Sequence, residues 1–189
     1  MNPFKKFDLW FNLAKKKYPY DPTAFALATS YKDKPVVRMV LLKLILKDGY
    51  VFFTNLKSKK GRDFNYNNNL SMCFYWETIN KQIRIFGKGE VVDSKISDDY
   101  FSSRPRGSQI GAWASKQSSV LNSKKQLLEK EKLYTKRFEG MTVPRPDYWV
   151  GIKVVPKEFE FWQQGDFRLH EREHYSLKKK SWEKKILSP

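Results

Sequence analysis

The sequence predicts an α+β fold in which an antiparallel split β-barrel carries peripheral helices. About six segments rich in β-branched and aromatic residues are separated by turns, and the helical patterns are grouped apart from them. The 189 residues include 14 Phe, 10 Tyr and 6 Trp, which supply a large core. We see no internal repeat and no long linker, so we expect residues 1–189 to form a single domain.

The first predicted elements are a helix and two strands. Apolar residues recur at spacings of three and four from Phe4 to Ala14, which predicts an amphipathic helix over residues 4–17. Residues 23–30 are predicted as a strand. Residues 36–46 are almost continuously apolar and β-branched, which is typical of a strand buried on both faces.

A hairpin and a capped helix follow. Asp48-Gly49 is a strong turn signal leading into a strand over residues 50–55. Ser58 is a suitable N-cap for a short helix over residues 58–65. The next strands are predicted over residues 70–76 and 82–92.

The middle of the chain is predicted to be helical and its last part extended. Pro105 separates two short helices, and Gly140 fits the position after the end of a third. The three helices are expected over residues 97–103, 108–115 and 123–138. Two long strands joined at residues 164–166 are expected over residues 148–163 and 167–177.

The composition excludes several classes of protein. A single cysteine, Cys73, rules out an internal disulfide framework, and two histidines are too few for a His-rich zinc site, so we expect no metal. No apolar run approaches the ~20 residues of a membrane-spanning helix. The first residues lack the apolar stretch of a signal peptide. We therefore expect a cytoplasmic protein that does not contact membranes.

The chain is strongly basic, with a formal net charge of +17. One interpretation is a nucleic-acid-binding module, which would bind with a steep salt dependence and no cofactor. However, 28 of the cations are lysines scattered along the chain, and no recognition helix, RNP-like or zinc motif is present. We therefore expect no specific nucleic-acid partner. The nine arginines are more informative, because a guanidinium binds phosphate through a fixed fork.

Two cations interrupt the apolar segment at residues 36–46. Burying Arg38 and Lys43 is costly unless each meets an anion or solvent. Their separation of five positions would place them on opposite faces of an ideal strand. Either a bulge intervenes, or the two side chains serve different groups.

A second constellation lies at residues 100–108. Tyr100 and Arg104 are four positions apart on one helix face, and Ser108 lies near the start of the next helix, whose free N–H groups favour an anion. Together they would form a phosphate cradle. A surface turn with two arginines would have the same pattern.

A third constellation lies near the C-terminus. Arg168, His170 and Arg172 are spaced by two, so we expect them on one face of a strand, with Trp162 across the preceding turn. Such a row suggests an anionic or planar partner. Weaker candidates, each also compatible with a solvated loop, are Gln82, Gln117-Ser118 and the helix start at Ser58-Lys59-Lys60.

These residues lie in motifs that resemble the pyridoxine/pyridoxamine 5′-phosphate oxidase family. The matching stretches are RMVLLK at 38–43, FFTN at 52–55, SKK at 58–60, YFSSRPRGSQIGAWASKQSS at 100–119 and EFWQQGDFRLHER at 160–172. The resemblance extends from about Pro3 to Pro189. Two departures are Lys59, where arginine is common, and Glu171, where aspartate is usual.

The resemblance implies a split-barrel flavoprotein that works as a homodimer with FMN at the subunit interface. The implied reaction oxidises pyridoxine or pyridoxamine 5′-phosphate to pyridoxal 5′-phosphate, with O2 as acceptor and hydrogen peroxide as a product. The amine also releases ammonia. A flavin reductase or another FMN protein of this fold is the alternative, separated from the oxidase only by the matches at residues 100–108 and 168–170.

The resemblance also implies roles for individual residues. Arg168 and His170 are the implied catalytic pair, which holds the pyridine ring against the flavin. The substrate phosphate is expected at Lys43, Tyr100, Arg104 and Ser108. The expected FMN-binding residues are Arg38, Met39, Val40, Leu41, Leu42, Lys43, Phe53, Thr54, Lys59, Lys60, Gln82, Gln117, Ser118, Trp162 and Arg172.

Overall fold

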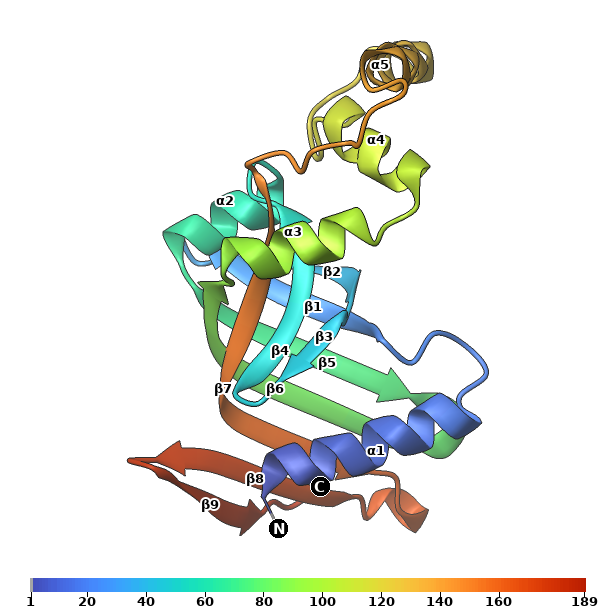
Figure 1. Ribbon diagram of the computed structural model, residues 1–189. Helices are drawn as coiled ribbons and strands as arrows, with labels where there is room; N and C mark the ends of the chain where they lie inside the picture. Colours follow the sequence, from blue (N-terminus) through green and yellow to red (C-terminus); the bar gives the residue numbers. More distant parts are fainter. Residues whose placement is uncertain (1) are drawn as a thin grey trace.

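One antiparallel sheet of nine strands forms the centre of the computed structural model, which describes residues 2–189 (Figure 1). The strands are β1 (Ala24–Tyr31), β2 (Lys34–Leu41), β3 (Leu44–Leu46), β4 (Gly49–Asn55), β5 (Asn69–Trp76), β6 (Lys81–Val91), β7 (Trp149–Gln163), β8 (Glu171–Lys178) and β9 (Ser181–Ile186). The helices are α1 (Pro3–Lys17), α2 (Lys59–Tyr66), α3 (Ser94–Ser102), α4 (Arg106–Ala114) and α5 (Lys124–Arg137). The predicted α+β class is confirmed.

The long strand β7 divides the sheet, because two different strands pair with the two halves of one of its edges. One edge of β7 pairs with β6 along nearly its whole length, in the main sheet order β2-β1-β5-β6-β7-β4-β3. On the other edge, the first half of β7 pairs with β4 and the second half with β8. The register shifts between Phe86 and Gly87, where a Cβ on Gly87 would lie 2.3 Å from the Val155 carbonyl oxygen. The sheet curls but does not close.

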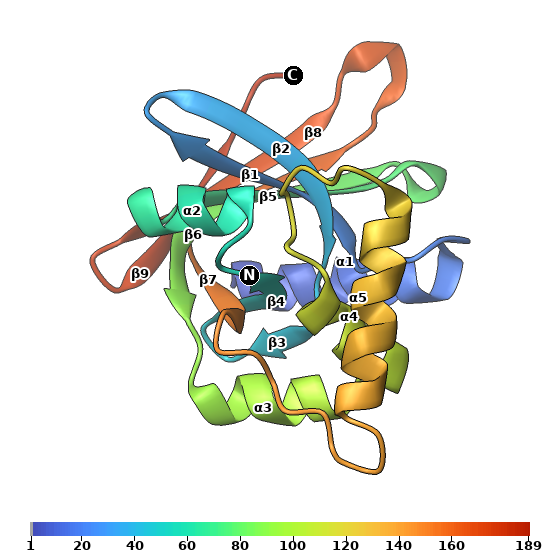
Figure 2. The same cartoon turned by 90° about the horizontal axis from the view of Figure 1, so that it is seen from above.

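Two clusters of buried side chains support this arrangement. In the larger cluster, α1 packs Phe7 and Trp10 against the sheet, with ring centroids 4.4 Å from Tyr50 and 5.3 Å from Phe161 respectively. A smaller cluster joins α3, α4 and the end of α5 to β7 through Phe101, Ile110, Phe138, Val143 and Trp149. This second cluster holds α3, α4 and α5 together on one side of the sheet (Figure 1), and α4 and α5 lie side by side (Figure 2).

The segment at residues 36–46 differs from the prediction of one fully buried strand. It divides into β2 and β3, because the amides of Leu42 and Lys43 bond to the Thr23 and Val51 carbonyls instead of continuing one ladder. One face of β2 is also open, since Val37 and Met39 are each 65% exposed. The prediction of strand structure from the apolar pattern is therefore confirmed, and the prediction that both faces are buried is wrong.

The C-terminal hairpin also differs from its prediction. The strand expected from residue 167 begins only at Glu171, after a 3-10 turn over Asp166–Arg168. Phe167 and Arg168 have positive φ angles of 53° and 65°, which no strand permits. The strand β9 was not predicted. No helix within residues 2–189 is long and apolar enough to cross a membrane.

Candidate functional site

A cleft of about 510 Å³ lies between the end of β2, strand β4 and helices α2 to α4. Residues from the motifs at 38–43, 52–55, 58–60 and 100–119 meet in this cleft. The predicted cofactor or substrate residues that line it are Met39, Val40, Leu41, Lys43, Phe53, Thr54, Lys60, Tyr100, Arg104, Ser108 and Gln117. Sequence elements separated by up to 110 positions, from Met39 to Trp149, thus contribute to one cleft.

Aromatic rings form one wall of the cleft. Phe53 stacks on Tyr100 and Trp149, with ring centroids 4.1 and 5.0 Å away and interplanar angles of 8° for both pairs. The guanidinium of Arg104 lies 4.8 Å from the Trp149 ring centroid, in a cation–π contact. The wall is therefore planar and apolar, and it carries a cation at its edge.

Arg104 is held in the cleft without a protein acceptor for one of its nitrogens. The Nη1 atom is buried and makes no hydrogen bond in the described structure. Burial lowers the pKa of Arg104, and burial raises the pKa of Tyr100 four residues before it. A buried donor without an acceptor is costly, so this position favours an anionic ligand.

The turn that carries Arg104 is held by a residue that the sequence analysis did not single out. The buried side-chain amide of Gln109 donates to the carbonyls of Phe101 and Ser102, at 3.0 Å each. These bonds tie the end of α3 to α4, on which Ser108 lies. A buried glutamine within an apolar helix face is the only sequence signal for this role.

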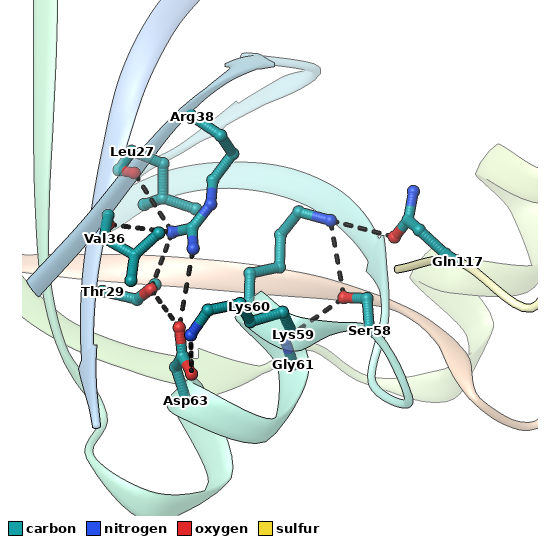
Figure 3. A network of polar contacts seen from close by, with 10 residues as sticks. All are labelled: Leu27, Thr29, Val36, Arg38, Ser58, Lys59, Lys60, Gly61, Asp63 and Gln117. Atoms are coloured by element: carbon teal, nitrogen blue, oxygen red, sulfur yellow. Dashed lines mark hydrogen bonds and ion pairs between the residues drawn. The ribbon is translucent and has the colours of Figure 1, made fainter. Parts of the chain in front are cut away.

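The hydroxyl of Thr54 and the ammonium group of Lys60 lie on another side of the cleft. The Thr54 hydroxyl is buried and has no hydrogen-bond partner among residues 2–189. Lys60 donates to the Gln117 side-chain oxygen at 2.9 Å, near the Ser58 cap of α2 (Figure 3). Burial, and then the nearby charge of Arg38, lower the pKa of Lys60. An anion here would meet a partly desolvated ammonium group.

Arg38 lies behind the cleft lining. Its Nη1 atom donates to the Thr29 hydroxyl at 2.7 Å, and its Nη2 atom lies 3.5 Å from Asp63. Burial lowers the pKa of Arg38, and the Asp63 charge opposes this effect. The same carboxyl lies 3.5 Å from Lys59. Asp63 was not predicted from the sequence, since a lone acid in a short basic helix resembles a solvated residue.

Three predicted cofactor residues lie elsewhere in the chain. Gln82, Trp162 and Arg172 are register partners on β6, β7 and β8. Arg172 is ion-paired with Glu160 at 3.1 Å. In both views the β7–β8 end of the sheet lies far from α3 and α4 (Figures 1 and 2). One chain therefore does not bring these residues to the cleft.

The remaining predicted FMN residues differ in their exposure. Leu42 belongs to the main core and is 3% exposed, so it does not line the cleft. Ser118 is exposed and adopts a positive φ of 66° in the turn after α4. The side chain of Lys59 is 51% exposed.

The predicted catalytic pair lies in the loop before β8, and the prediction that Arg168, His170 and Arg172 share a strand face is wrong. Arg168 is exposed in the 3-10 turn, and only Arg172 belongs to the strand. The Gly165 amide donates to Nδ1 of His170 at 3.3 Å, and the His170 ring lies 4.7 Å from Trp162. A Cβ on Gly165 would lie 2.1 Å from the Leu169 carbonyl oxygen, so the loop requires glycine there.

Family models match most of the chain. Residues 15–133 match the family model described as pyridoxamine 5′-phosphate oxidase. Residues 149–189 match the model described as the pyridoxine 5′-phosphate oxidase C-terminal dimerisation region. The cleft residues fall in the first match, apart from Trp149, and the β7–β9 hairpins fall in the second.

Curated relatives agree with this assignment. A pyridoxine/pyridoxamine 5′-phosphate oxidase of Pelagibacter ubique is 45% identical over 100% of this chain and 92% of its own length. The enzyme of the same name from Ehrlichia chaffeensis is 48% identical over 93% of this chain and 90% of its own length.

Solved structures share the fold. PhzG from Burkholderia lata, solved in complex with tetrahydrophenazine-1-carboxylic acid, superposes with a TM-score of 0.93 at 28% identity, covering 99% of this chain and 92% of its own. A pyridoxamine 5′-phosphate oxidase-related, FMN-binding protein from Nostoc punctiforme gives a TM-score of 0.78 at 13% identity, with 100% and 99% coverage. The predicted split-barrel fold is confirmed.

Proposed function

Because the chain belongs to the pyridoxamine 5′-phosphate oxidase family, we propose that its cleft binds FMN beside a phosphorylated B6 substrate. The chain is an oxidoreductase of vitamin B6 metabolism that oxidises pyridoxine or pyridoxamine 5′-phosphate. The observation that carries the proposal is the presence of two groups of cations at one cleft, since cofactor and substrate each carry a phosphate.

The residues at the first group of cations fit the phosphate of FMN. Lys60 lines the cleft, and Arg38 and Lys59 lie behind it around Asp63. The unpartnered hydroxyl of Thr54 supplies a further hydrogen-bonding group on the same cleft. When bound, FMN supplies a ring that accepts a hydride equivalent from C4′ of the substrate and passes its electrons to O2.

The second group of cations is proposed to hold the substrate phosphate. Lys43, Tyr100, Arg104 and Ser108 line the same cleft, and no group in the described part of the chain accepts a hydrogen bond from the buried Nη1 of Arg104. Anchoring the phosphate would fix C4′ against the flavin. Such orientation can contribute several kcal/mol to catalysis, up to roughly 7–11 kcal/mol.

We propose that the C4′ end of the substrate meets Arg168 and His170. Because the Gly165 amide donates to Nδ1 of His170, the proton of the neutral ring lies on Nε2. This arrangement favours hydrogen-bond donation from Nε2 to the C4′ substituent over acceptance of a proton there. The exposed guanidinium of Arg168 would cover the face of the pyridine ring.

One chain does not place these residues at the cleft, so we propose a homodimer with two shared sites, in which a second subunit supplies them. The match of residues 149–189 to a dimerisation region supports this assembly. The exposed apolar face of β2 and the adjoining sheet face around Ala26, Ala28 and Cys73, which together border a cavity of about 580 Å³, are the proposed contact. The partner's Arg168 and the partner's His170 would complete each cleft. The cytoplasmic location stays a prediction.

The products follow from the balance of the reaction. The alcohol substrate and O2 give pyridoxal 5′-phosphate and hydrogen peroxide. The amine substrate consumes one water in addition and releases ammonia. The oxidised carbon is C4′, which loses two electrons in both cases.

The test is reduction of the flavin without oxygen. We expect the FMN-loaded protein to be bleached by pyridoxamine 5′-phosphate or pyridoxine 5′-phosphate, and to be re-oxidised by air with one hydrogen peroxide per flavin. Unphosphorylated pyridoxamine should bleach it far more slowly at equal concentration. A protein that binds no FMN, or whose flavin is reduced by a nicotinamide cofactor but not by these substrates, would contradict the proposal.

A further inference from the structure

A buried carboxylate lies among the cations of the proposed FMN phosphate site. Asp63 on α2 is only 3% exposed. Its Oδ2 accepts a hydrogen bond from the Thr29 hydroxyl at 2.7 Å and lies 3.5 Å from Nη2 of Arg38, while its Oδ1 lies 3.5 Å from Nζ of Lys59 (Figure 3). The proposed reaction has no step that uses this group.

The hydrogen bonds fix Arg38 in one position. Its Nη1 donates to the carbonyls of Leu27 and Val36, both at 3.2 Å, and to the Thr29 hydroxyl. The Thr29 hydroxyl in turn donates to Asp63, so it links the carboxylate to the guanidinium a second time. Together with the ion pair between Asp63 and Nη2, these bonds restrict the guanidinium far more than solvent would.

Asp63 also reduces the net positive charge of the cations around it. Arg38, Lys59 and Lys60 bring three positive charges into one small region, and Asp63 reduces their sum to +2 (Figure 3). A phosphate monoester carries about −1.5 to −2 charges at neutral pH. The cluster with Asp63 therefore matches the charge of one phosphate and limits repulsion between its cations when no phosphate is bound.

We propose that Asp63 is a positioning residue, which holds the Arg38 guanidinium in place for the phosphate of FMN. This role rests on the proposed function. It acts through this guanidinium, and it predicts that Asp63 affects binding of the phosphate group and not of the flavin ring.

The test measures binding of FMN and of riboflavin to the apoprotein. Asp63→Asn keeps the size of the side chain and removes its charge, and we expect FMN affinity to fall about tenfold, as for loss of a charge-assisted hydrogen bond. Riboflavin affinity should change less than twofold. Asp48→Asn, which removes an exposed carboxylate at the β3–β4 turn, is the matched control and should bind FMN like the wild type.

A double-variant cycle separates positioning from a general effect on the fold. In an Arg38→Met background, Asp63→Asn should change FMN affinity less than twofold, because the residue through which it acts is gone. Thr29→Val, which removes the second link, should weaken FMN binding about threefold and serves if Asp63→Asn does not fold.

Three results would overturn this role. They are unchanged or tighter FMN binding by Asp63→Asn, an equal loss of riboflavin affinity, and a loss that persists in the Arg38→Met background. Wild-type protein that binds no FMN would instead overturn the proposed function, and this is read before any variant is compared.

Discussion

At the scale of single side chains, the proposed substrate recognition centres on Arg104. Its guanidinium is placed by contacts with Trp149 and Phe101, and one buried nitrogen has no acceptor in the described chain. A lysine would keep the charge but lose both the planar fork and the stacking. The position is therefore matched to an anion of phosphate shape.

Arg104→Met is expected to lower kcat/KM for pyridoxamine 5′-phosphate by about 10- to 100-fold, mainly through KM, because a charge-assisted hydrogen bond is lost. FMN affinity should stay within twofold of the wild type. Steady-state kinetics and flavin titration measure the two effects. Arg137→Met, which removes an arginine of α5 outside the cleft, is the control. If the main defect of Arg104→Met were weaker FMN binding, Arg104 would contact the cofactor and not the substrate.

The sequence located most single residues of the cleft but not their supports. The motifs around Lys43 and Arg104 carry uncommon residue types in apolar surroundings, which sets them apart in any sequence. Asp63 and Gln109 have no such mark, because their function depends on burial and on contacts with distant strands or turns. Only the folded chain reveals these two.

At the scale of elements, predictions succeeded where local chemistry decides the structure. Asp48-Gly49 forms the predicted hairpin, and Ser58 caps α2 by accepting from the Gly61 amide. The break between β2 and β3 was missed, since the apolar pattern continues through it. The loop before β8 was missed because residues spaced by two are also expected on one face of a strand. The positive φ angles of Phe167 and Arg168 exclude a strand there.

The contact between α1 and the C-terminal hairpin predicts a pH-dependent stability. Burial alone would raise the pKa of Glu173, but hydrogen bonds from Lys6, Lys184 and Tyr175 outweigh it and lower the pKa from 4.5 to about 2. A lowered pKa stabilises the fold above the unfolded value, and this contribution is lost as the pH falls from about 4.5 towards 2.

Glu173→Gln should therefore lower the free energy of unfolding at pH 7 by about 1–3 kcal/mol, allowing for solvent screening. The gap to the wild type should shrink between pH 4.5 and pH 3. Urea unfolding at fixed protein concentration measures it, with Glu183→Gln on β9 as the exposed control. A gap that does not change with pH would show that Glu173 acts by packing and not by charge.

At the scale of the whole molecule, one chain holds two separated halves of the proposed site. The cleft lies beside α3 and α4, while Arg168 and His170 lie in the loop at the other end of the sheet (Figure 1). The sequence carried both halves, but linear order cannot tell whether they meet within a chain or between chains. In the proposed twofold dimer, each cleft would face the loop of the other subunit.

The most direct test of this shared site uses hybrid dimers of two inactive variants. One chain carries Arg104→Met with Lys43→Met in the cleft, and the other carries Arg168→Met with His170→Asn in the loop. Because a hybrid holds one site with both lesions and one with none, purified hybrids should recover about half of the activity of a wild-type dimer. Hybrids no more active than the mean of the two parents would contradict the account, since each site would then be built from a single chain.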